Sequence, residues 1–207
     1  NAFRPGFFDT DKYKETGSVL VANGTNIFAV CHVADTPLTF STPGTQWQAL
    51  NGALTHGFAE VPIHALSFLL QDPRVASVPI TQKLGAKIYQ VSNTPFKFQD
   101  AVLVGAGESY YGECRFEIDL SAPAYVKLDR SVLKGMFGKF NPSRGDLVFS
   151  KMGDLLGIMV NNTYCLLIKN FDASATFDFG TDVRGQNTGN TLAALDAVVQ
   201  QMPSKLQ

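Results

Sequence analysis

The chain has no surplus of positive charge and no long apolar run, and each shortage excludes a class of function. Its 207 residues carry 17 Lys and Arg against 18 Asp and Glu, which gives a formal charge of -1. Because no excess of cations is available to neutralise phosphates, we expect no nucleic-acid partner. No apolar run reaches the roughly 20 residues that a membrane-spanning helix needs, so we expect no membrane span.

Cysteine is scarce as well. Cys31, Cys114 and Cys165 are odd in number, and none belongs to a C-x-x-C pair. This pattern disfavours both a disulfide framework and a closed zinc site. We therefore expect three small buried side chains, and no metal or cofactor.

The first residues, NAFRPGFFDTDKYK, lack the basic-then-apolar pattern of a signal peptide. They also lack an initiator methionine. A leader or a further domain before Asn1 therefore stays open as an expectation, and so does the compartment.

Short β-type segments, rich in Val, Ile, Phe, Tyr and Leu, alternate with Gly, Asn, Asp and Pro along most of the chain. The segments NGT (23–25) and KMGD (151–154) are predicted hairpin turns, so neighbouring strands should be antiparallel. The predicted strands lie at 17–24, 25–33, 36–42, 86–93, 100–107, 113–120, 124–129, 146–151, 155–161 and 164–170.

Two segments are predicted to be helical, near 46–57 and at 190–202. The second places Leu192, Leu195, Val198, Val199 and Met202 on one face, which should pack on the body of the protein. The stretch 72–85 contains two prolines and shows no clear period. We expect it to connect two β halves.

Three segments resemble the trypsin-like serine proteases. GSVLVANGTNIFAVCHVAD is similar to the hairpin whose strand ends on the catalytic histidine, a position that His32 occupies. FNPSRGDLVFSKMGDLLGIMV is similar to the G-D-S-G-G-P segment and the strands after it, with Ser143 at the nucleophile. HALSFLLQDPRVASVPITQKLGAKIYQV is similar to the strand that carries the acid and the linker after it, with His64 at the acid position.

The resemblance implies an all-β fold of two antiparallel six-stranded β-barrels of chymotrypsin type with a C-terminal helix. The first barrel would comprise 1–79 and carry His32 and His64. The second would comprise 80–207 and carry Ser143, with the helix at 190–202.

The resemblance also implies a serine endopeptidase that acts on a peptide or protein through an acyl-enzyme. Ser143 would attack the scissile carbonyl while His32 removes its proton, and a third group would orient His32. A neutral His64 brings no negative charge, and removing the carboxylate from a protease triad costs about 10⁴-fold in turnover. Glu60, Asp35, Asp72 and Asp100 remain alternative third members, although Asp100 leaves little chain for the strands before Ser143.

By the same resemblance, the backbone N–H groups of Asn141 and Ser143 would form the oxyanion hole. Pro142 disfavours this arrangement, because a residue before proline is pushed towards extended backbone. The specificity pocket would have Phe137 at its base and Val160, Asn161 and Asn162 along its wall. Without a charged residue, that pocket would suit a small or apolar side chain.

Two other interpretations stay open. The same shell would bind a peptide or protein in the cleft between the barrels without cutting it, as a catalytically inactive module. Alternatively, the chain is an unrelated β-barrel or sandwich, in which His32 is a structural imidazole and Ser143 a turn residue.

Overall fold

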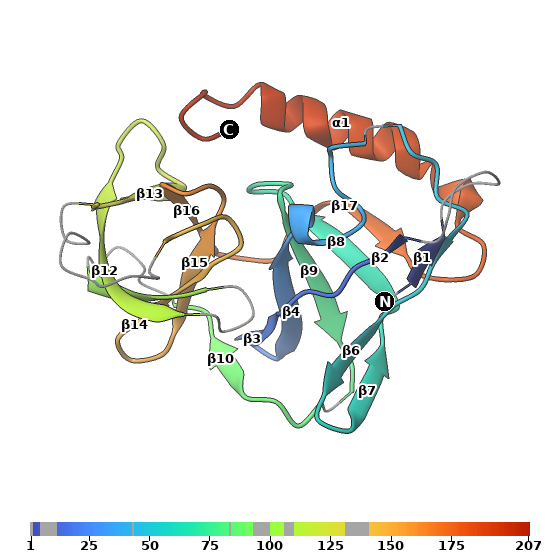
Figure 1. Ribbon diagram of the computed structural model, residues 1–207, viewed down its shortest axis with the longest axis horizontal. Coiled ribbons are helices and arrows are strands. Elements are labelled where there is room, and N and C mark those ends of the chain that lie inside the picture. Colours follow the sequence, from blue (N-terminus) through green and yellow to red (C-terminus); the bar gives the residue numbers. More distant parts are fainter. Residues whose placement is uncertain are drawn as a thin grey trace.

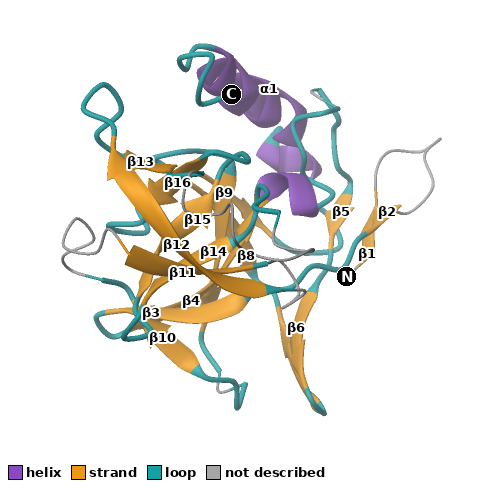
Figure 2. Ribbon diagram, turned by 60° about the vertical axis from the view of Figure 1, so that its left-hand side comes forward, coloured by secondary structure: helices purple, strands orange, loops and turns teal. Residues whose placement is uncertain are grey.

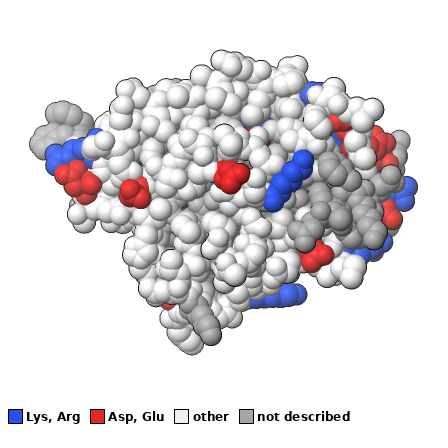
Figure 3. Space-filling model, turned by 180° about the vertical axis from the view of Figure 1, so that it is seen from behind, with Lys and Arg blue, Asp and Glu red and all other residues white. Residues whose placement is uncertain are grey.

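The computed structural model describes residues 2–4, 12–42, 44–82, 84–92, 100–105, 110–130 and 141–207. Within these ranges the protein is mostly β, with one α-helix near the C-terminus (Figure 1). None of the helices in this part of the chain is long and apolar enough to cross a membrane. Lys and Arg form no continuous patch among the coloured residues of the face shown in Figure 3.

One half of the molecule is a closed six-stranded antiparallel barrel with the strand order β11-β12-β13-β16-β15-β14. Alternation explains its core, since Cys114 and Phe116 of β12 point inward while Arg115 and Glu117 are exposed. The turn predicted at 151–154 is present, with Gly153 at a φ of 92°. The strands are β11 (Asp100–Val104), β12 (Tyr111–Ile118), β13 (Tyr125–Leu128), β14 (Leu147–Ser150), β15 (Leu155–Met159) and β16 (Tyr164–Leu167).

The other half is an open mixed sheet, which we call the first sheet, with the order β10-β3-β4-β9-β8-β17. Its edge strand β10 runs parallel to β3. The resemblance implied two closed six-stranded barrels. The structure has one closed barrel, and an open sheet stands where the other was expected. Its strands are β3 (Val19–Asn23), β4 (Asn26–His32), β8 (Ala65–Leu69), β9 (Val75–Ile80), β10 (Ile88–Gln90) and β17 (Ala173–Asp178).

The C-terminal part of the chain completes the first sheet. Strand β17 pairs with β8 along its length, and α1 (Thr188–Gln200) buries Leu192 and Leu195 in the same apolar cluster as Trp47 and Phe177. Figures 1 and 2 show α1 beside this sheet. A unit ending at residue 79 would therefore lack two strands of this sheet, β10 and β17, and the helix that covers its core.

The helix predicted at 190–202 is confirmed as α1, although Val198 on its expected buried face is 50% exposed. The helix predicted near 46–57 is wrong. That stretch forms β5 (Ala49–Leu50) and the first strand of a hairpin of β6 (Ala53–His56) and β7 (Ala59–Pro62), which turns at Gly57 with a φ of 60°. A left-handed glycine in the turn favours the hairpin over a helix.

Two other predictions from local pattern fail. Residues 36–42 form turns rather than a strand. The stretch 72–85 contains strand β9, which lies between β4 and β8. Pro79 is tolerated there because β8 pairs only with Ser77 and Ala76 of this strand. A small three-stranded sheet of β2 (Lys12–Tyr13), β1 (Ala2–Arg4) and β5 completes the described structure.

Candidate functional site

The barrel and the first sheet pack together along an apolar junction. One buried cluster contains Val30 and Val75 from the first sheet together with Tyr125, Val160 and Leu166 from the barrel. Side chains at this junction are thus held by a common core, and the candidate site lies at its edge.

His32 is the last residue of β4, where the strand reaches the junction opposite Val75 of β9. Only 5% of the residue is exposed. Its Nδ1 accepts the N–H of Ala34 at 3.1 Å and so caps the short 3₁₀ helix Val33–Asp35. Because an accepting Nδ1 carries a lone pair, the proton of the neutral ring lies on Nε2. Nε2 is buried and makes no hydrogen bond to the residues that the structure describes.

The surroundings of His32 favour its neutral form. Burial, together with the positive charges of Arg144 and Arg74, lowers the pKa of His32 to about 4. The carboxylate of Asp72 and the carbonyl of Val160 act in the opposite direction. Near neutral pH the imidazole is therefore uncharged.

Ser143 lies in the turn that leads into β14, and its side chain is exposed. Its backbone N–H donates to Oδ2 of Asp146 at 2.7 Å, and its Oγ lies 3.4 Å from Oδ1 of the same carboxylate. The Tyr110 hydroxyl lies within hydrogen-bond distance of this carboxylate and of the Asn141 carbonyl. Burial and the neighbouring carboxylate raise the pKa of Tyr110 to about 12. In this arrangement the Ser143 hydroxyl is held by Asp146.

Gly145 lies in the same turn as Ser143, which we call the serine turn, and the backbone of this turn comes close to His32 at Gly145. Its φ is 87°, and a Cβ at this position would lie 2.7 Å from Oδ2 of Asp35 and 3.6 Å from Cβ of His32. Both the backbone angle and the close approach call for glycine here. Two segments more than a hundred residues apart therefore meet, although no hydrogen bond joins Ser143 Oγ to His32 within the described chain.

His64 lies at the other end of the first sheet from His32. It directly precedes β8, which is antiparallel to β9, and His32 pairs with the first residue of β9. The end of β8 near His32 is therefore Leu69. His64 is exposed, and its carbonyl accepts the N–H of Phe179 at 2.7 Å.

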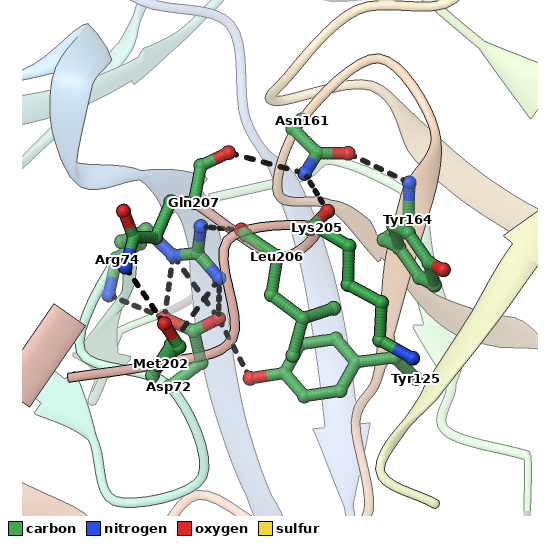
Figure 4. A network of polar contacts seen from close by, with 9 residues as sticks. All are labelled: Asp72, Arg74, Tyr125, Asn161, Tyr164, Met202, Lys205, Leu206 and Gln207. Atoms are coloured by element: carbon green, nitrogen blue, oxygen red, sulfur yellow. Dashed lines mark hydrogen bonds and ion pairs between the residues drawn. The ribbon is translucent and has the colours of Figure 1, made fainter. Parts of the chain in front are cut away.

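The turn between β8 and β9 places Asp72 at the His32 end of the sheet. Asp72 is fully buried, and its Oδ2 lies 2.6 Å from Nη2 of Arg74. It also accepts the N–H of Arg74 at 2.9 Å and the hydroxyl of Tyr125 at 3.0 Å (Figure 4). Asp72 is thus close enough to act on the charge of His32, but it is bonded to Arg74.

The other alternative acids lie in different surroundings. Asp35 is half-buried under Gly145, and burial raises its pKa. Glu60 is exposed on the β6–β7 hairpin. Asp100 is exposed at the start of β11, where it pairs with Arg115 at 2.9 Å. Of these three, the structure brings only Asp35 to the serine turn.

The residues expected around the reacting carbonyl have other partners here. The Ser143 N–H donates to the carboxylate of Asp146, and Asn141 is exposed. Val160 is buried at the junction, and Asn162 accepts a bond from Arg130 through its carbonyl. Asn161 accepts the N–H groups of Thr163 and Tyr164 and donates to the Lys205 carbonyl. Phe137 lies outside the described residues.

The remaining reactive side chains are possible metal ligands and the three cysteine thiols. The described chain holds no group of three or more His, Cys, Asp and Glu placed to bind a metal ion. Cys31 is half-buried, and Cys114 and Cys165 are buried. Burial raises the pKa of Cys31 to about 12, so this thiol stays protonated near neutral pH.

Sequence reasoning missed Arg74, which bonds to Asp72, and Asp146, which bonds to Ser143. It also missed Tyr110, which bonds to Asp146. One signal was available for Arg74. The charged Asp72-Pro73-Arg74 turn stands between two apolar runs, and buried charges of opposite sign need each other as partners.

Comparisons with known proteins give no relative to add to this description: a scan of protein-family models, a search of curated proteins and a search of solved structures each returned no match.

Proposed function

We propose that the protein is a serine endopeptidase of the trypsin-like type, with Ser143 as nucleophile and His32 as general base. The close approach of Gly145 to His32 is the observation that carries this proposal, because the backbone of the serine turn passes near this residue. The closed six-stranded barrel and the strand that ends on His32 also agree with the resemblance to that family. The substrate would be a peptide or protein, with no metal or cofactor.

We assign the third role to Asp72 in place of His64. A triad acid must lie beside the histidine that it orients, and Asp72 is at the His32 end of the sheet while His64 is at the other end. Asp72 also supplies the negative charge that an imidazolium needs.

The reaction needs two changes from the arrangement described above. The Ser143 hydroxyl must turn from Asp146 towards His32, and the imidazole must give up Ala34 so that Nε2 carries the lone pair. Ser143 Oγ then attacks the scissile carbonyl while Nε2 takes its proton, which passes to the leaving amine as the acyl-enzyme forms. Water then hydrolyses the ester by the same route. Because both changes precede chemistry, we expect a slow enzyme.

A serine-directed fluorophosphonate tests this function without knowledge of the substrate. We expect slow covalent labelling of the wild-type chain, detected as a mass increase, and no labelling of Ser143→Ala. Ser41→Ala removes another exposed serine and should label like wild type.

The second candidate is an inactive module that binds a peptide or protein in the same cleft. Specific observations favour it, since Asp146 holds both the N–H and the hydroxyl of Ser143 and His32 caps a helix through Nδ1. Absence of labelling at high probe concentration, with the chain shown to be folded, would favour the module and contradict the endopeptidase.

A further inference from the structure

Arg74 is held from two sides at the junction. Towards the first sheet, its Nε lies 3.0 Å from Oδ1 of Asp72, and its Nη2 lies 2.6 Å from Oδ2. On the other side, Nη1 donates to the carbonyl of Leu206, and Nη2 lies 3.6 Å from the sulfur of Met202 (Figure 4). The guanidinium is therefore fixed in one orientation by residues far apart in the sequence.

The segment 202–207, which we call the strap, is in turn fastened to the barrel. Asn161 Nδ2 donates to the Lys205 carbonyl at 3.2 Å, and Lys205 Nζ lies 2.6 Å from Oδ2 of Asp119. Leu206 is 4% exposed and packs in the apolar cluster of the junction. The strap thus links Arg74 of the first sheet to the barrel.

The bonds that Asp72 makes to Arg74 limit how far its carboxylate can orient or stabilise His32. Its side-chain oxygens bond to Arg74 and Tyr125, and no hydrogen bond joins Asp72 to His32 among the described residues. The guanidinium also places a positive charge beside the carboxylate. His32 therefore gains little of the stabilisation that an unpaired carboxylate would give to its charged form.

We propose that Arg74 is a positioning residue that keeps the Asp72 carboxylate from His32 for as long as the strap holds it. The inference rests on the proposed function. Movement of the strap releases the guanidinium, Asp72 then orients and stabilises the protonated His32, and Ser143 becomes more reactive. The strap is in this sense an inhibitory contact within the chain.

Two variants weaken the contact in different places. Arg74→Gln removes the charge at Asp72, and Leu206→Ala loosens the strap while it leaves the ion pair in place. Arg184→Gln is the matched control, because Asp182 and Arg184 form an ion pair of the same spacing that is exposed. Folding of each variant is checked by circular dichroism and thermal unfolding. If Arg74→Gln does not fold, the labelling rate and the His32 pKa of Leu206→Ala test the proposal by themselves.

Two readouts are used, the rate of fluorophosphonate labelling at Ser143 and the pKa of the His32 imidazole by NMR. For Arg74→Gln we expect both to rise, the rate by up to about tenfold for each pKa unit that the base gains, since the rate of general-base catalysis follows base strength only in part. Leu206→Ala should change both in the same direction by less. Arg184→Gln should change neither. Arg74→Lys keeps the charge but lacks the fork that bonds both Asp72 and the Leu206 carbonyl, so it should fall between wild type and Arg74→Gln.

The outcomes separate this inference from the proposed function. A rise in the His32 pKa without labelling of any variant would support the role of Arg74 and contradict the endopeptidase. Labelling of wild type at the same rate as Arg74→Gln and Leu206→Ala, with an unchanged His32 pKa, would overturn the role of Arg74 and leave the endopeptidase standing. The groups that act on this pKa besides Arg74 and Asp72 are Arg144 and the Val160 carbonyl, and the variants leave both unchanged.

Discussion

The two ends of the first sheet differ more in environment than in sequence. One end carries His32 and Asp72, packs on the barrel and buries an ion pair. The other end carries His64, which precedes an apolar run much as His32 follows one, yet this imidazole is exposed. Both histidines stand next to a strand. The difference shows that strand direction and the packing partner at each end decide which histidine is buried at the junction with the barrel.

The largest change in the free energy of unfolding should follow when the buried Asp72–Arg74 ion pair, at the His32 end of the sheet, is broken. Asp72→Asn leaves the charge of Arg74 buried without its carboxylate, which costs about 3–5 kcal/mol in comparable sites. We expect a loss of this order in the free energy of unfolding measured with urea. The control is Asp182→Asn in the exposed Asp182–Arg184 pair, which should unfold like wild type. Equal losses in the two variants would contradict the importance of burial here.

A smaller effect should follow from the titration of His32. Its pKa in the folded chain is lowered from the ordinary 6.5 to about 4, so between these values the unfolded chain binds the proton more readily. The contribution to stability is therefore complete above about pH 6.5 and is lost as the pH falls towards 4. It is on the order of 3 kcal/mol, from a shift of about two and a half units at 1.36 kcal/mol each.

The measurement is the free energy of unfolding of wild type and His32→Gln at a series of pH values. Carboxylates titrate in both proteins, so the difference between the two curves isolates His32. We expect this difference to change with pH between 6.5 and 4. Parallel curves would mean that His32 is as solvated in the folded chain as in the unfolded one.

The smallest effect is expected at the exposed end. His64→Gln should change the free energy of unfolding by less than about 0.5 kcal/mol, as substitutions at solvated positions usually do. The rate of fluorophosphonate labelling should also stay at the wild-type value. A large drop in that rate would restore His64 to the triad position and remove Asp72 from it.

Local pattern predicted the strands of the barrel and the C-terminal helix, but not the strand that completes the first sheet. The six barrel strands are continuous alternating or apolar runs between turn residues, and their hairpins are short, so neighbours in sequence are mostly neighbours in space. The first sheet depends instead on β17, which arrives from nearly a hundred residues beyond β9. The prolines at 73 and 79 also led to the prediction of a connection where β9 lies. Pairing over such distances leaves no trace in a local window.

The candidate site was predictable in part. Resemblance placed His32 at a strand end and Ser143 in a turn, and the structure brings these two segments together through Gly145. The assignment of His64 to the acid position stays a prediction. The structure places His64 before β8, at the end away from His32, and Asp72 after it, and sequence alone does not say which strand pairs with β4. The bonds from Asp146 to Ser143 and from Arg74 to Asp72 depend on three-dimensional packing.

The central claim is that the imidazole of His32 activates the hydroxyl of Ser143. Its most direct test is the labelling rate of His32→Gln beside wild type, with the modified residue located by peptide mass spectrometry. The account predicts an adduct on Ser143 of the wild-type chain and a loss of at least about a hundredfold in rate for the variant, the lower range of general-base catalysis. An equal rate in the two proteins, or an adduct on another residue, would contradict it.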